Sequence, residues 1–121
     1  MILRRLVLAI ALLSAGAASA HEVKSQHGGR VTDAGKYHFE LVARGESVDV
    51  FVSDGDQKPI PAAGFKGTAI LVVDGKPARI PLEAADGNRL SGKGTLALGD
   101  KPKGAVQLTG PDGATASGKF N

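Results

Sequence analysis

The chain contains no cysteine and no tryptophan, and its single methionine is the first residue. The lack of cysteine excludes disulfides, thiolate metal sites and thiol catalysis. The lack of any methionine after Met1 removes the thioether ligands that favour Cu⁺. One tyrosine and four phenylalanines are the remaining aromatics, so we expect a core made mostly of valine, leucine, isoleucine and alanine.

The sequence also lacks the motifs that mark several classes of enzymes and nucleic-acid-binding proteins. No nucleophile elbow is present, and the segment 92–94 (GKG) has neither the spacing of a phosphate loop nor a helical pattern behind it. No basic stripe is interleaved with aromatic residues, although the chain carries 15 basic and 12 acidic residues. We therefore predict a protein that is not an enzyme and does not bind nucleic acid.

The first twenty residues are typical of a secretory signal peptide. Arg4 and Arg5 precede the apolar run 6–13, and Ala18-Ser19-Ala20 provides a small–x–small cleavage site before His21. Eight helical residues rise only about 12 Å, too little to span a bilayer. We expect cleavage after residue 20, no stable membrane anchor and a periplasmic location, with a cut after residue 17 as the alternative. Loss of both arginines lowers the net charge from +3 to +1.

The pattern of the remaining residues predicts β-structure. Short β-rich segments alternate with Gly, Asp, Asn and Pro at a spacing of roughly 8–12 residues, which is typical of a sandwich or barrel. No segment carries a convincing helical stripe. We predict an all-β fold, an immunoglobulin-like antiparallel sandwich of about seven strands, with a small barrel as the second choice. Residues 21–30 would be a flexible arm and residues 31–121 a single domain.

The clearest pair of strands spans residues 37–43 and 47–54. Apolar and polar residues alternate along both segments, and a two-residue turn at 45–46 places Leu41 opposite Val50 on one face. Glycine at the first turn position suits a type II′ turn. This hairpin is therefore predicted with a defined register.

A second hairpin is expected around Asp74-Gly75. The continuous apolar run 69–73 predicts a strand covered on both faces. In the return strand, Pro77 and Pro81 cannot donate to a ladder, so we expect that strand at a sheet edge. The glycines of segment 89–98 indicate a bulge or a close backbone approach.

Potential metal ligands gather near the start of the predicted domain. His38 and Glu40 are two residues apart on a strand and point to the same face, and the predicted register adds Asp49 to it. A second imidazole from the arm would complete a site for Zn²⁺ or Cu²⁺. The histidines and nearby carboxylates are His21, Glu22, His27, Asp33, His38, Glu40 and Asp49. The candidate metal ligands are His21, His27, His38, Glu40 and Asp49, and solvated surface residues are the alternative.

Two further predictions about metal binding concern single segments. If cleavage leaves His21 first, its amino group and imidazole can chelate one metal ion together, whereas a frayed terminus is the alternative. The segment 54–56 (DGD) resembles the start of a calcium loop but lacks the later acidic positions, which favours a plain turn.

The segments 27–31 (HGGRV) and 34–42 (AGKYHFELV) together resemble small periplasmic proteins associated with heavy-metal efflux. They are also similar to accessory segments of the periplasmic adaptor subunits of cation efflux pumps, as are the runs 58–69 and 88–94. The resemblance implies a periplasmic protein that handles Cu, Zn, Co or Ni and has efflux-pump components as partners. His27, His38 and Glu40 are the matching polar positions. The coiled-coil and lipoyl-type domains of a full adaptor are missing from this sequence.

Two hypotheses follow. The first is a periplasmic accessory or metal-binding protein linked to heavy-metal handling or efflux. The second is a protein–protein interaction module of the bacterial envelope that binds no metal and uses an exposed sheet edge near Ile80 together with the outward-facing Phe51.

Overall fold

The computed structural model describes residues 23–121, which form eight antiparallel strands and no helix. The strands are β1 (Arg30–Ala34), β2 (Tyr37–Arg44), β3 (Ser47–Ser53), β4 (Lys66–Val73), β5 (Lys76–Ala84), β6 (Arg89–Lys93), β7 (Lys103–Thr109) and β8 (Thr115–Phe120). The predicted signal peptide and His21 lie outside the described residues. No helix within residues 23–121 has the length and apolar character needed to span a bilayer.

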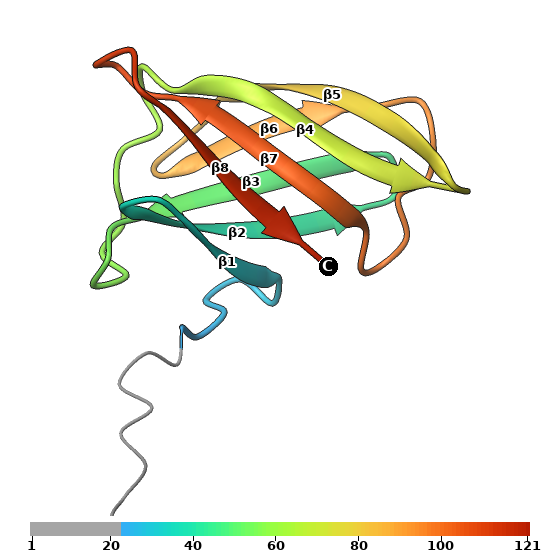
Figure 1. The fold of residues 1–121 in the computed structure, drawn as a ribbon, viewed down its shortest axis with the longest axis horizontal. Helices are drawn as coiled ribbons and strands as arrows, with labels where there is room; N and C mark the ends of the chain where they lie inside the picture. Colours follow the sequence, from blue (N-terminus) through green and yellow to red (C-terminus); the bar gives the residue numbers. More distant parts are fainter. Residues whose placement is uncertain (1–22) are drawn as a thin grey trace, which may run out of the picture.

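The predicted all-β class is confirmed, but the predicted immunoglobulin-like sandwich of two sheets is wrong. All eight strands belong to one sheet, in the order β1-β2-β3-β6-β5-β4-β7-β8, which curls into a nearly closed barrel (Figure 1). Glycines allow neighbouring strands of this sheet to pack closely, because a Cβ atom at Gly92 would lie 2.8 Å from Ile80 Cγ2 and one at Gly67 would lie 2.7 Å from Leu108 Cδ2. The architecture is therefore closer to the small barrel.

The β2–β3 hairpin has the predicted register. Leu41 pairs with Val50 and Arg44 pairs with Ser47. Gly45 has a φ of 57° while Glu46 has no positive φ, as a type II′ turn requires. The alternating apolar side chains of both strands fill the barrel interior. His38, Glu40 and Asp49 consequently lie on the outer face.

The β4–β5 hairpin forms at Asp74-Gly75, but two expectations about it are wrong. Val72 is 48% exposed, so β4 is not covered on both faces, because the outer face of a single curled sheet meets solvent. β5 is not an edge strand either, since it pairs with both β4 and β6. The β5–β6 ladder contains only Glu83 and Ala84 on β5, and both prolines lie beyond it, where no hydrogen bond to β6 is needed.

The sheet's true edges are β1, a strand that the sequence analysis did not predict, and β8. The two strands contact each other without a ladder, and β8 comes back over β1 where the sheet almost closes (Figure 1). A Cβ atom at Gly118 would lie 2.7 Å from Thr32 Cγ2, so the two edges pack closely. Arg30 donates to the carbonyl oxygens of Pro102 (2.9 Å) and Asn121, and its guanidinium lies 5.9 Å from the centre of the Phe120 ring. Arg30 thereby joins the two edges.

Candidate functional site

Glu40 is the centre of a polar cluster on the outer face of β2. Its side chain is buried, with the whole residue only 6% exposed, because the segment 24–29 lies over it. One carboxylate oxygen, Oε2, accepts hydrogen bonds from Ser25 Oγ and from the backbone N–H groups of His27 and Gly29, each at 2.9 Å. The other, Oε1, accepts from the backbone N–H of Gln26 at 3.2 Å and is 2.9 Å from His27 Nδ1. The predicted arm is therefore attached to the sheet through this carboxylate.

These contacts lower the pKa of Glu40. Burial by itself raises the pKa of the carboxyl group, but the hydrogen bonds from His27, Gly29 and Ser25 outweigh it, so the net shift is below the ordinary value of 4.5. The carboxylate is thus held in its charged form by the segment that covers it. A local turn makes this possible, since Gly28 has a φ of 74° and Gly29 lies too close to the carbonyl oxygen of Leu41 for any side chain.

The His27 ring is fixed by a second contact. It stacks on Phe51 of β3 with 3.6 Å between ring centroids and 6° between ring planes. Glu40 and Phe51 are paired across the β2–β3 ladder, so the carboxylate and the aromatic ring that hold His27 come from neighbouring strands. Phe51 does point outward as predicted, but the imidazole covers part of it.

His38 belongs to a different pair. Its Nδ1 is 2.9 Å from the backbone carbonyl oxygen of Asp54, and its Nε2 is 2.8 Å from Asp33 Oδ1. Asp33 pairs with His38 across the β1–β2 ladder, and its side chain is 82% exposed. From the sequence, Asp33 was counted among the carboxylates near the histidines but was not assigned to the metal site. The unpredicted strand β1 is what brings it next to His38.

Asp49 lies on the predicted face but has its own partner. Its Oδ1 is 3.2 Å from Arg89 Nη1, and Arg89 also pairs with Asp86 at 2.6 Å. The hydrogen bond from Arg89 lowers the pKa of the exposed Asp86, and Asp86 in turn raises the pKa of Arg89. Asp49 is therefore part of an ion-pair chain rather than of the Glu40 cluster.

The structure thus divides the five predicted ligands. It joins His27 to Glu40, places His38 with Asp33 and Asp49 with Arg89, and does not describe His21. Within residues 23–121 no group of three histidine and acidic side chains is arranged to hold a metal ion. In the segment 54–56, Asp54 Oδ1 accepts from the N–H groups of Asp56 and Lys58, as in a plain turn.

Three of the five contacts to Glu40 come from backbone N–H groups, and sequence reasoning missed them all. Every residue type except proline has a backbone N–H group, so the residue types do not show which of these groups will donate. The one pattern that could have indicated the contacts is a carboxylate on a strand that follows a Gly-Gly turn. Comparison with known proteins does not add an assignment: no protein family, no curated protein and no solved structure matches this chain.

Proposed function

We propose that this chain is a non-enzymatic periplasmic accessory protein that binds Zn²⁺ or Cu²⁺ in heavy-metal handling or efflux. The observation that carries the proposal is the way its two described histidines are held. Each has its Nδ1 beside an oxygen that can only accept a hydrogen bond, the Glu40 carboxylate for His27 and the Asp54 carbonyl for His38.

An acceptor oxygen at Nδ1 favours a hydrogen on that nitrogen. A neutral imidazole that donates from Nδ1 has Nε2 left to bind a metal ion. His38 Nε2 also lies beside the Asp33 carboxylate, so a metal ion bound there would take the place of the hydrogen between the two groups. Metal-binding histidines are commonly held in this way, by a carboxylate or a backbone carbonyl on the other ring nitrogen. In this reading Glu40 positions His27 rather than binding the metal itself.

His38 and Asp33 offer the better of the two positions. Nε2 and Oδ1 are already adjacent, 2.8 Å apart, and Asp33 is at the surface where an ion can enter. Nitrogen and oxygen donors suit Zn²⁺ and Cu²⁺. Two protein ligands leave coordination positions open for water or for a partner's side chain, unlike a structural zinc site closed by four ligands. Such an open site fits a protein that passes metal on.

Location and partners rest on the sequence. The signal-like first twenty residues support export, and the resemblance of segments 27–31 and 34–42 supports a link to efflux-pump components. His21 remains a further predicted ligand if it becomes the first residue.

The test is a calorimetric titration with Zn²⁺ and Cu²⁺ of untagged protein purified from the periplasm, after its N-terminus has been sequenced. We expect stoichiometric binding that Asp33→Asn or His38→Gln weakens at least about tenfold. Asp100→Asn, an equally conservative change at another exposed aspartate, is the matched control and should bind as the wild type does.

No binding by the folded wild type, or unchanged affinity in both site variants, would contradict the proposal. The interaction module that binds no metal would then be preferred. It has the weaker structural support, because β5 is paired along both sides at Glu83 and Ala84 and carries prolines where its second edge is open.

A further inference from the structure

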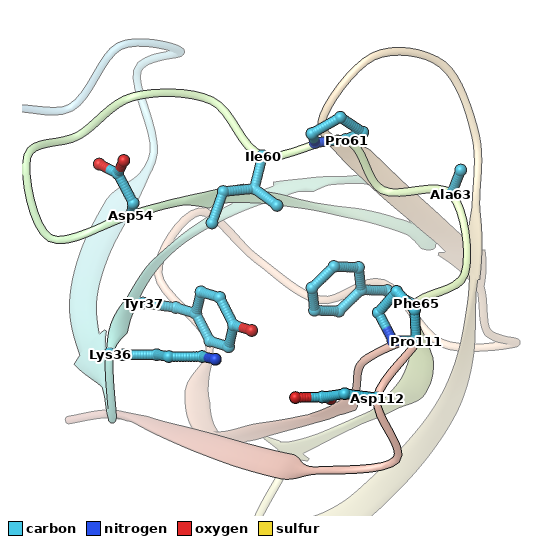
Figure 2. Close-up of a pocket in the computed structure, with 9 residues that line it drawn as sticks. All are labelled: Lys36, Tyr37, Asp54, Ile60, Pro61, Ala63, Phe65, Pro111 and Asp112. Atoms are coloured by element: carbon cyan, nitrogen blue, oxygen red, sulfur yellow. The ribbon is translucent and has the colours of Figure 1, made fainter.

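A cavity lies at the end of the barrel where three segments meet. It is bounded by the start of β2, the loop between β3 and β4, and the turn between β7 and β8 (Figure 2). Its volume is about 580 Å³, within the range of pockets that bind small molecules. Its apolar walls are formed by Tyr37, Ile60, Pro61, Ala63, Phe65 and Pro111.

Two of the wall residues, Tyr37 and Phe65, are anchored in the core. The Tyr37 and Phe65 rings meet edge to face, with centroids 5.7 Å apart and an 80° angle between planes. Tyr37 also stacks on the fully buried Phe39, and Phe65 is itself 5% exposed. On the far side, Gly64 has a φ of 84° and lies so close to Pro111 that a Cβ atom would be 2.9 Å from Pro111 Cγ. Tyr37 and Phe65 therefore give the cavity an aromatic wall that is fixed by the core.

Two opposite charges face this apolar space. Lys36 Nζ lies 5.2 Å from the centre of the Tyr37 ring, and both its ammonium group and the Asp112 carboxylate point into the cavity from different sides (Figure 2). Neither belongs to any of the ion pairs found in residues 23–121. Asp112 Oδ1 accepts from the N–H of Ala114, which leaves Oδ2 for another donor. Asp54, the third charged residue of the lining, is engaged by the N–H groups of its own loop.

We propose that this cavity binds a short apolar peptide, a zwitterion with its ammonium group and its carboxylate at opposite ends of an apolar body. Lys36 receives the ligand's carboxylate, Asp112 receives its ammonium group, and the apolar body packs against Tyr37 and Phe65. The proposal does not depend on metal binding, since none of these groups belongs to the His38–Asp33 pair.

The two charged groups disfavour ligands that carry only one kind of charge or no charge. A wholly anionic ligand would meet Asp112, and a wholly cationic one would meet Lys36. A neutral apolar ligand would remove water from both charged groups without offering either a partner, which is costly. A ligand that carries both charges at the ends of an apolar body satisfies all three parts of the cavity.

The test is an NMR titration of the ¹⁵N-labelled protein, purified as for the calorimetric test, with the dipeptide Leu-Phe and two blocked forms of it. N-acetyl-Leu-Phe lacks the ammonium group, and Leu-Phe amide lacks the carboxylate. We expect Leu-Phe to shift the cavity resonances at millimolar concentration, and each blocked form to bind about tenfold more weakly.

Two variants make the assignment specific. Lys36→Gln should weaken Leu-Phe about tenfold and leave Leu-Phe amide unchanged. Asp112→Asn, which keeps an oxygen acceptor for Ala114, should weaken Leu-Phe to the same degree and leave N-acetyl-Leu-Phe unchanged. Asp100→Asn is the control. Equal binding of all three probes, effects that do not cross in this way, or no shifts with Leu-Phe would each overturn the proposal.

Discussion

Strand β2 contributes to two regions of the molecule that treat charge in opposite ways. At Glu40 a buried carboxylate accepts two contacts from side chains and three from backbone N–H groups. At the cavity, beside Tyr37, the charged Lys36 and Asp112 are exposed and lack ion-pair partners within residues 23–121. A buried charge is stable only when its hydrogen-bonding capacity is filled, whereas an exposed charge keeps that capacity for a ligand. Glu40 therefore serves stability, whereas the cavity charges are the groups that we propose for ligand binding.

The largest expected effect is that of Glu40→Ala. It removes the acceptor of five contacts at once, and we expect the free energy of unfolding to fall by about 3 kcal/mol. Urea unfolding measures the loss, and hydrogen exchange should show that the N–H groups of Gln26, His27 and Gly29 lose protection. Unchanged protection of these three amides would contradict the role given to the carboxylate.

Phe51→Ala should have the next largest effect. It removes the ring on which His27 stacks, and we expect a loss of about 1–2 kcal/mol, since Phe51 is only partly buried. Thermal unfolding of the variant is the measurement. Phe51→Tyr is the matched control, because it keeps the stacked ring and should stay close to the wild type.

The pH dependence of stability tests the role of the buried Glu40 carboxylate separately from that of the exposed charges. Because the folded pKa of Glu40 is lowered, the charged carboxylate contributes stability above its ordinary pKa of 4.5, and that contribution is lost as the pH falls through the folded value. As the pH falls below the ordinary pKa of 4.5, the unfolding free energy of the wild type should therefore decrease more steeply than that of Glu40→Gln. Asp86 shifts in the same direction but is present in both proteins, so the difference isolates Glu40. Parallel pH curves would show that Glu40 does not account for the slope.

The smallest effect is expected in the cavity. Lys36→Gln and Asp112→Asn should each change the free energy of unfolding by less than about 0.5 kcal/mol, because both side chains are exposed and neither forms an ion pair in the described residues. Chemical denaturation of the two variants checks this. A large loss in either would mean that the charge stabilises the barrel and would weaken its assignment to ligand binding.

Local pattern was sufficient to predict the hairpins. The parity of apolar residues and the Gly45 and Asp74-Gly75 turns gave the β2–β3 and β4–β5 pairs, because both signals lie within about ten residues. Strand order depends on ladders between distant segments such as β3 and β6, and periodicity does not encode them. β1 was missed because RVTDA is short, partly polar and directly follows Gly-Gly.

The same distinction applies to the candidate site. The spacing of His38 and Glu40 correctly placed both on one outer face, since strand residues two apart point the same way. What each residue contacts was not predictable from spacing. Glu40 is engaged mostly by backbone N–H groups. Asp33 lies beside His38 because the unpredicted strand β1 pairs with β2.

The meeting of β1 and β8 has a consequence for folding. Arg30 contacts the carbonyl oxygen of Asn121, so this closure joins residues that are 91 positions apart in the sequence. Contacts of such separation carry the largest loop-closure entropy, and chains rich in them fold slowly. Every hairpin can form as its own two strands become available, but the barrel can close only after the last strand has emerged. During synthesis, the outer edge of β1 is therefore exposed until β8 is present.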